Sequence, residues 1–327
     1  MSHSGIKLED LVVLAPELAV LIAAILLSII DLLLPDNKKR TLIGYLTLVG
    51  LAVSAAFVIG RLGSDPVSVL GFTYRSDDFA NLMKLFLLGS TALVVYMSIG
   101  FVRRDGIQHE GEYYYLYLPA VLGGMIMVSS ADLITLYVGL ETLSITSYIL
   151  VGIRKLNPAS NESAFKYAVL GAVSSAVILY GMSFLYGMSG STGISAIQTA
   201  LNTRMTDMSP LIYVSFFLLL AGFGFKIAAF PFHTWAPDVY RGASTPVTAF
   251  LAVISKGAAM AVLFRLMYGI YFGLGNESAP YPIAEDAFLT MAVVAAAAMI
   301  VGNAAALRQT NAKRLFAYSG IANAGYL

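Results

Sequence analysis

The 327-residue sequence contains no cysteine and only one tryptophan. Without cysteine, the chain can form no disulfide, no thiolate metal site, no iron–sulfur ligation and no cysteine nucleophile. Charged residues are also scarce, at 12%, whereas hydrophobic residues make up 58%. A soluble domain usually has about 25% charged and about 45–50% apolar residues. One protein core cannot hold this surplus of apolar side chains, so the sequence predicts a membrane protein.

A strong charge of either sign is missing as well. The formal net charge of +1 argues against nucleic acid or an acidic partner as the reason for this composition. The N-terminus lacks the basic region and the small-residue cleavage site of a signal peptide. The first apolar run is therefore expected to stay in the protein as a membrane span.

Apolar runs long enough to cross a bilayer recur along the chain. About 20 apolar residues are needed to cross about 30 Å of hydrocarbon. Such runs predict spans at 11–34, 42–60, 78–101, 113–129, 131–153, 164–188, 210–241, 246–272 and 285–307, with a tenth starting near 313. The predicted fold class is an all-α polytopic membrane protein with about ten spans present.

Basic residues are unequally divided between the two sets of loops. One set holds eleven: Lys38, Lys39, Arg40, Arg103, Arg104, Arg154, Lys155, Arg241, Arg308, Lys313 and Arg314. The other set, with the N-terminus, holds Lys7, Arg61, Arg75 and Arg204. Because cytoplasmic loops carry the excess of lysine and arginine, this division predicts an N-terminus outside the cell.

The remaining basic residues lie inside predicted spans: Lys84, Lys166, Lys226, Lys256 and Arg265. Lys256 and the acidic Glu141 each lie about ten residues from a span end, which is roughly 15 Å deep. Ionisable groups at that depth are costly and usually functional. We therefore expect both to act in ion or proton movement. The alternative for each is a paired or hydrogen-bonded group that fixes helix packing.

The other charged positions have simpler interpretations. Lys166 follows Glu162 by four residues, so an ordinary ion pair along one helix face explains it. Lys84 and Arg265 lie within two turns of the outer surface, where long side chains can reach the headgroups. Both are therefore expected to be interfacial anchors. Asp132 is expected to cap the helix that follows it.

Polar and helix-breaking residues are concentrated in the stretch FKIAAFPFHTWAPDVYRG, residues 225–242. A continuous helix over 211–241 would be about 46 Å long, more than a bilayer needs. Pro231 and Pro237 each remove a backbone donor, which predicts a helix broken around Phe230–Pro231 with Lys226 one turn earlier. Broken helices at membrane depth often mark the ion site of a transporter. A merely kinked structural helix is the alternative.

Three further side chains of this stretch are open to interpretation. His233 is either a proton relay between the break and the cytoplasm or a satisfied hinge histidine. Trp235 is expected to anchor the membrane interface. Asp238 is expected to tie down the end of the second half-helix.

Four motifs together resemble a known family. They are YVGLETLSITSYILVG around Glu141, SAFKYAVLGAVSSAVILYG around Lys166, AGFGFKIAAFPFHTWAPDVYRGASTPVTAFLAVISKGA around Lys226 and Lys256, and NAKRLFAYSGIANAGYL near the end. They resemble the antiporter-like subunits of respiratory complex I and of multi-subunit cation/proton antiporters, over essentially the whole chain. Within that family, PDVYRGASTPVTAFLAVISK is most similar to the subunit N group of bacterial NADH-quinone oxidoreductases.

The resemblance implies a proton-translocating membrane subunit of that enzyme in a bacterial cell membrane. It implies that Glu141 and Lys226 form a coupling pair, that Lys166 lies beside it, and that Lys256 passes the proton along a central polar axis. NADH, FMN, iron–sulfur clusters and quinone would belong mainly to other subunits, so this chain is expected to bind no cofactor or metal. Its expected partners are other membrane-arm subunits, including neighbouring antiporter-like subunits, and through them the hydrophilic arm.

The resemblance also implies a domain organisation. Residues 1–112 would form a three-span N-terminal region, 113–272 the first five-helix repeat, and 273–327 the incomplete start of a second, inverted repeat. Family members have about fourteen spans, so the sequence is expected to be a fragment or a truncated gene product. A subunit of a multi-subunit sodium/proton antiporter and a purely structural membrane subunit are the alternative functions.

Single-cysteine labelling tests the predicted orientation, because the chain has no native cysteine. Ser2→Cys and Ser278→Cys should react with an impermeant thiol reagent from outside, whereas Asn37→Cys and Ser160→Cys should react only from the cytoplasm. Labelling of position 37 from outside would contradict the orientation.

Overall fold

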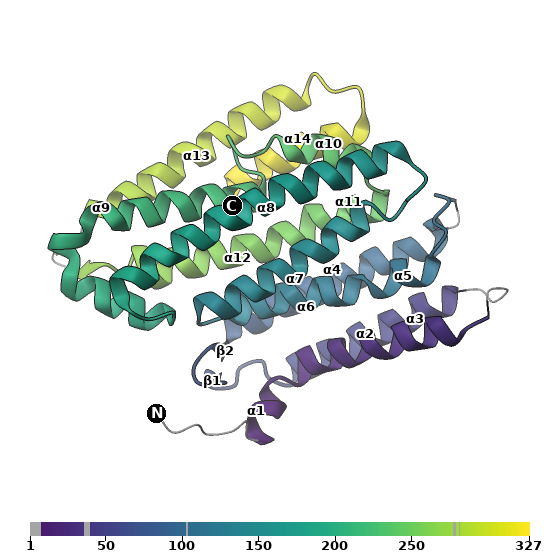
Figure 1. Ribbon diagram of the computed structural model, residues 1–327, viewed down its shortest axis with the longest axis horizontal. Helices are drawn as coiled ribbons and strands as arrows, with labels where there is room; N and C mark the ends of the chain where they lie inside the picture. The colour runs from purple at the N-terminus through teal and green to yellow at the C-terminus, as the bar shows by residue number, and fades with distance from the viewer. Residues whose placement is uncertain (1–7, 36–39, 103, 277–278, 281) are drawn as a thin grey trace.

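The computed structural model is a bundle of long helices that lie side by side (Figure 1). It describes residues 8–35, 40–102, 104–276, 279–280 and 282–327. The first half of the chain forms α1 (Leu8–Val13), α2 (Ala15–Leu33), α3 (Thr41–Ile59), α4 (Asp78–Phe101), α5 (Glu110–Tyr115), α6 (Tyr117–Ser129) and α7 (Leu133–Val151). The second half forms α8 (Pro158–Ser189), α9 (Ile194–Ile227), α10 (Trp235–Gly242), α11 (Thr245–Phe250), α12 (Lys256–Leu266), α13 (Pro282–Ala306) and α14 (Ala312–Tyr326).

Short irregular elements interrupt the helices. The hairpin of β1 (Val67–Val69) and β2 (Tyr74–Ser76) joins α3 to α4, and β3 (Gly275–Asn276) pairs with β4 (Ala279–Pro280) before α13. Two π-helical turns, η1 (Leu251–Ser255) and η2 (Met267–Tyr271), flank α12. A π-helical turn is rare, and such turns are frequently found at functional sites.

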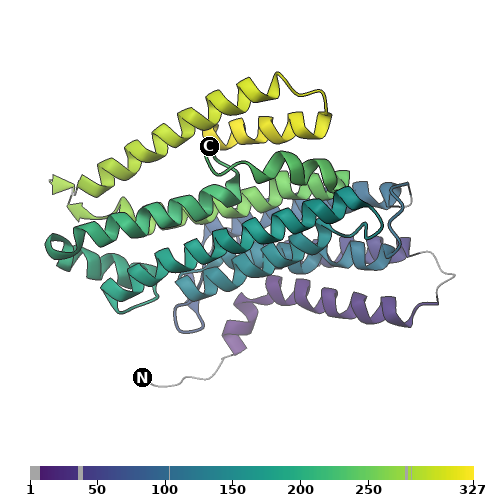
Figure 2. The ribbon, with the colours of Figure 1, turned by 45° about the horizontal axis from the view of Figure 1, so that its top comes forward.

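Two helical hairpins form opposite edges of the bundle. The α2–α3 hairpin lies at one edge and the α13–α14 hairpin at the other, with α4 and α6–α12 between them in both views (Figures 1 and 2). The buried apolar side chains of these elements join into one large cluster that extends from α2 to α14. Many large apolar side chains remain exposed, on α2, α3 and α8 for example, as expected where the solvent is lipid.

The chain is a multi-pass membrane protein. Within the described residues, eight helices are long and apolar enough to cross a bilayer: Ala15–Leu33, Thr41–Ile59, Asp78–Phe101, Leu133–Val151, Pro158–Ser189, Pro210–Ile227, Thr245–Tyr271 and Pro282–Ala306. They correspond to predicted spans one to three and five to nine. The fourth predicted span is divided into α5 and α6, and the tenth is the shorter α14. Helix α9 also begins at Ile194, earlier than the predicted start near residue 210.

The connection between α6 and α7 is as tight as the sequence predicts. Asp132 caps α7 by accepting hydrogen bonds from the backbone amides of Ile134 and Thr135, which confirms its expected part. The two helices then cross at glycines. A Cβ atom on Gly123 of α6 would lie 2.5 Å from the backbone nitrogen of Leu143 and 2.6 Å from the carbonyl oxygen of Gly139. Only glycine permits this close crossing.

The structure changes one of the labelling positions. Ser160 is fully buried and its hydroxyl donates to the Val151 carbonyl oxygen, so it is a poor position for a thiol reagent. Leu156, which is 80% exposed in the same loop region, is the better choice. Ser2, Asn37 and Ser278 lie outside the described residues.

The glycine crossing gives a stability prediction. Gly123→Ala should destabilise the purified protein by about 1–3 kcal/mol, because a methyl group has to force α6 and α7 apart. Gly89→Ala is the matched control: a Cβ at that position of α4 has no neighbour within 4 Å. Thermal unfolding in detergent measures both. Equal melting temperatures for the two variants would contradict the tight crossing.

Candidate proton-transfer site

The predicted break in span seven is present. Helix α9 ends at Ile227, and α10 begins at Trp235 after a segment that contains a cis peptide bond between Phe230 and Pro231. Ala228 takes the left-handed conformation, with φ of 56°. Its amide donates to the Phe225 carbonyl, and the amide of Ala229 donates to the Gly224 carbonyl. These two bonds form the motif that commonly ends a helix.

Lys226 lies in the last turn of α9, directly before the break. The side chain is buried, and its ammonium group donates a hydrogen bond of 2.7 Å to the hydroxyl of Ser144 on α7. A longer contact of 3.5 Å reaches the Tyr148 hydroxyl, and the ammonium group lies 5.8 Å from the centre of the Tyr148 ring. A cation at the carbonyl end of a helix is favoured by the helix dipole.

Glu141 lies on α7 one turn before Ser144. Its Oε1 atom is buried and forms no hydrogen bond with any described residue. The carboxylate acts electrostatically on Lys226, although the two form no direct ion pair within the described chain. The structure thus brings the two residues of the expected pair into one site, with Lys226 bound to Ser144.

Lys256 occupies a second buried position, at the junction of η1 and α12. Its ammonium group donates to the carbonyl oxygen of Gly320 on α14 at 3.1 Å and lies 5.9 Å from the centre of the Tyr240 ring on α10. It also lines a cavity of about 560 Å³ between α11–α12 and α14. The cavity is large enough to hold several water molecules.

Lys166 and Asp238 belong to a third group, around the start of α10. Lys166 forms the expected ion pair with Glu162, at 2.7 Å, and also contacts Asp238 at 3.3 Å. Arg314 of α14 donates to the other carboxylate oxygen of Asp238 at 2.7 Å. Asp238 therefore joins the second half-helix to both α8 and α14. Within the described chain, the ion pairs of Lys166 are with Glu162 and Asp238, at the start of α10, and not with the Glu141–Lys226 site.

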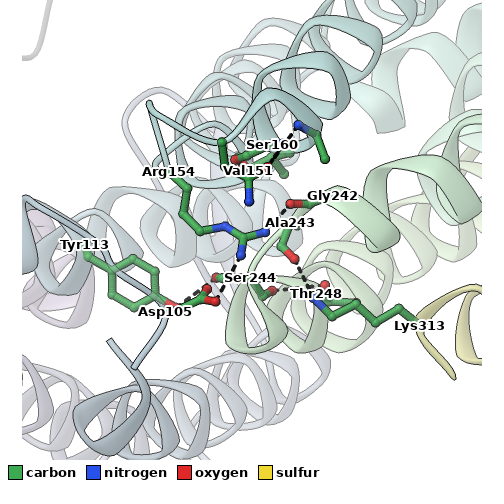
Figure 3. A network of polar contacts seen from close by, with 12 residues as sticks. Asp105, Tyr113, Val151, Arg154, Ser160, Gly242, Ala243, Ser244, Thr248 and Lys313 are labelled. Atoms are coloured by element: carbon green, nitrogen blue, oxygen red, sulfur yellow. Dashed lines mark hydrogen bonds and ion pairs between the residues drawn. The ribbon is translucent and has the colours of Figure 1, made fainter. Parts of the chain in front are cut away.

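The carbonyl end of α10 is held by two more cations. Figure 3 shows the side chains of Arg154 and Lys313 pointing to the carbonyl oxygens of Gly242 and Ala243, respectively. Arg154 also pairs with Asp105 at 3.0 Å. Cations at this end of a helix satisfy its last carbonyl groups. The half-helix is thus fixed at both ends by side chains from other elements.

His233 lies within the break itself. Its ring stacks on Phe230 at 5.5 Å and faces the ring of Tyr318 at 6.5 Å. Its Nδ1 atom is buried and has no hydrogen-bond partner among the described residues. The histidine therefore contacts α14. Among the described residues, no contact joins it to Lys226 or to Glu141. Its part as a relay stays a prediction.

Comparisons with known proteins match this arrangement. The family described as NADH:quinone oxidoreductase/Mrp antiporter, TM, matches residues 130–327. The chain belongs to this transmembrane family. It is 48% identical to NADH-quinone oxidoreductase subunit N of Paenibacillus sp. (strain JDR-2), over 98% of this chain and 64% of that protein. It is 47% identical to subunit N of Brevibacillus brevis, over 96% of this chain and 62% of that protein.

Solved structures share the fold of this chain. A chain of respiratory complex I from Thermus thermophilus with bound aureothin is 32% identical, with a TM-score of 0.77 over 95% of this chain and 62% of that one. A chain of the Mrp complex from Dietzia sp. DQ12-45-1b superposes with a TM-score of 0.74 at 21% identity, which shows the fold alone. The chain spans less than two thirds of the length of these curated relatives.

Two expectations about this family member are wrong. Lys84 does not face the lipid headgroups: it is 1% exposed and pairs with Glu17 at 2.9 Å. Arg265 is partly buried, and its charge is held within the protein by Asp77 at 2.7 Å. Trp235 is not an interfacial anchor either. It is 3% exposed, its indole nitrogen donates to the Phe225 carbonyl at 2.8 Å, and its ring stacks on Tyr167.

Glu17 is a further buried acid that the sequence pattern did not single out. This acid lies in the first turn of an apolar span, directly after Pro16, and it is buried. The rule that singled out Lys84, an ionisable residue within a predicted span, applies equally to Glu17. An acid in the first turn of a helix is also ordinary, because it stabilises the helix dipole, so the sequence alone does not mark Glu17 as functional.

Proposed function

We propose that the chain is part of a membrane-arm subunit of a proton-translocating NADH-quinone oxidoreductase. The observation that carries the proposal is Lys226, buried at the end of a broken helix and hydrogen-bonded to Ser144 beside Glu141. Relatives at 47–48% identity are named subunit N of that enzyme. Oxidation of NADH, by FMN and iron–sulfur clusters, and reduction of quinone would take place mainly on partner subunits.

In this proposal, Lys226 and Lys256 hold the proton in turn. Each ammonium group is hydrogen-bonded to a neutral oxygen, from Ser144 and from Gly320 respectively. Because neither is locked to a carboxylate by a direct ion pair, its charge responds to a change at Glu141 or in a neighbouring subunit. Tyr148 and Tyr167, with ring centres 4.8 Å apart, lie on the side of Lys226 that leads to Trp235 and α10.

A second candidate function is a subunit of a multi-subunit sodium/proton antiporter. The matching family includes Mrp antiporters, and a chain of an Mrp complex shares the fold. Both functions would use buried lysines to move a proton. They differ in the driving force, which is electron transfer from NADH in one case and a sodium gradient in the other.

Neutral substitutions in the full-length protein within its complex test the proton path. Lys226→Ala, Glu141→Gln and Lys256→Ala should each lower NADH-driven proton uptake in inverted membrane vesicles by about tenfold or more, because a proton-transfer group is lost. Ser144→Ala should lower it as well, because the hydroxyl holds Lys226. The matched control is Ser147→Ala on the same helix, whose hydroxyl only donates to the Leu143 carbonyl. Native gels measure assembly.

Three outcomes separate the candidates. Damage that appears only together with loss of the assembled complex would favour a purely structural subunit. Sodium-dependent proton exchange without NADH, abolished by Lys226→Ala, would favour the antiporter. Copurification of the native protein with flavin and iron–sulfur subunits would support the oxidoreductase.

A further inference from the structure

Three polar side chains from three separate elements meet in the N-terminal part of the bundle. Glu17 comes from the first turn of α2, Tyr74 from β2, and Lys84 from the second turn of α4. All three are buried. The ammonium group of Lys84 lies 2.9 Å from Oε1 of Glu17 and 2.6 Å from the Tyr74 hydroxyl, and that hydroxyl lies 2.7 Å from the same Oε1 atom.

The hydrogen bonds of this triad run in one direction. Lys84 donates to the Tyr74 oxygen, and Tyr74 donates to Oε1 of Glu17. A phenol in this position can accept a proton on its oxygen while it gives up its own. The triad therefore has the geometry of a relay from an ammonium group to a carboxylate, in addition to their direct contact.

The surroundings of the triad contain polar atoms that a purely structural ion pair does not need. Oε2 of Glu17 is buried and has no hydrogen-bond partner among the described residues. The Ser129 hydroxyl, at the end of α6, and the charge of Arg61 both act on the Tyr74 phenol. Tyr74 also forms a β-bridge with Ser130, in the turn that leads to α7 and Glu141. Polar groups thus extend from the triad to the outer end of α7.

We propose that Glu17, Tyr74 and Lys84 form a second proton-transfer site, on the predicted outer side of the membrane. The Lys84 ammonium gives a proton to the Tyr74 oxygen while Tyr74 gives its own proton to Oε1 of Glu17. The products are a neutral amine, an intact phenol and a neutral carboxylic acid. Glu17 then releases its proton outward, and the Lys84 amine takes up another from the membrane interior, which restores the original charges.

A low-dielectric site makes this exchange feasible. Burial of two opposite charges carries a desolvation cost that their attraction only partly offsets, so a buried pair has more to gain from internal proton exchange than a pair in water. Glu17 lies in the first turn of α2, which begins on the predicted outer side, whereas Lys84 lies about 10 Å along α4. This order fits release from Glu17. The proposal rests on the proposed proton-translocating function.

Tyr74→Phe is the sharpest test. It removes the bridging hydroxyl but leaves the aromatic ring and the direct Lys84–Glu17 contact in place. The matched control is Tyr271→Phe, which removes a buried hydroxyl that contacts only Ser215 among the described side chains. In the full-length protein within its complex, Tyr74→Phe should lower NADH-driven proton uptake in inverted vesicles by about tenfold, with normal assembly. The control should resemble the wild type.

A double variant separates proton transfer from structure. Glu17→Gln with Lys84→Met removes both charges at once and so leaves neither one buried without its partner. The proposal expects this variant to assemble but to pump poorly. Normal pumping by the double variant or by Tyr74→Phe, while Lys226→Ala is defective, would overturn the second site and leave the proposed function intact. Loss of assembly with Tyr74→Phe would instead show that the triad only stabilises the structure. Normal pumping by Lys226→Ala would overturn the proposed function itself.

Discussion

The rest of the structure depends on how the backbone is satisfied where span seven breaks. Hydrocarbon provides no hydrogen-bond partner, so an interrupted helix persists in a membrane only if protein or trapped water replaces the lost bonds. Here Ala228 and Ala229 turn back onto α9, and the Trp235 indole donates to the Phe225 carbonyl. Because the Trp235 ring also stacks on Tyr167 of α8, the same side chain joins the two half-helices to their neighbour. Lys226 is thereby held at a fixed place beside α7.

The same constraint sorts the buried cations into two classes. Lys84 and Arg265 lie against carboxylates, which cancel their charge locally. The ammonium groups of Lys226 and Lys256 are instead hydrogen-bonded to a hydroxyl and a backbone carbonyl, respectively, and both are neutral. A cation bound to neutral oxygens can lose its proton without leaving a carboxylate uncompensated. A cation paired with a carboxylate can lose its proton only if the acid takes that proton up. The Tyr74 phenol can bridge such a transfer from Lys84. Arg265 has no such route, because a guanidinium does not deprotonate in proteins.

The sequence predicts those features whose causes are local. Hydropathy located the spans, and Pro231 located the break, because a missing amide interrupts a helix at that residue whatever the surroundings. Asp132 capped its helix as expected for the same reason. The errors concern partners that are distant in sequence. Arg265 looked like an anchor because its partner Asp77 is 188 residues away, and Lys84 depends on Glu17 across two helices. Neither hydrophobic periodicity nor a local sequence motif shows which distant residue a charged side chain will contact.

Half-helix α10 connects these separate sites. Its first turn carries Asp238, which contacts Lys166 of α8 and Arg314 of α14, and its last carbonyls accept from Arg154 and Lys313. Its Tyr240 ring faces Lys256, and Trp235 at its start holds the end of α9. A change of charge at Lys166 would alter the balance of forces on this short helix, whose Tyr240 ring faces Lys256 and whose Trp235 holds the carbonyl of Phe225, the residue before Lys226. The broken span thus provides more than a gap in a helix: its second half is a short helix that contacts α8 and α14 through Asp238 and lies beside both Lys226 and Lys256.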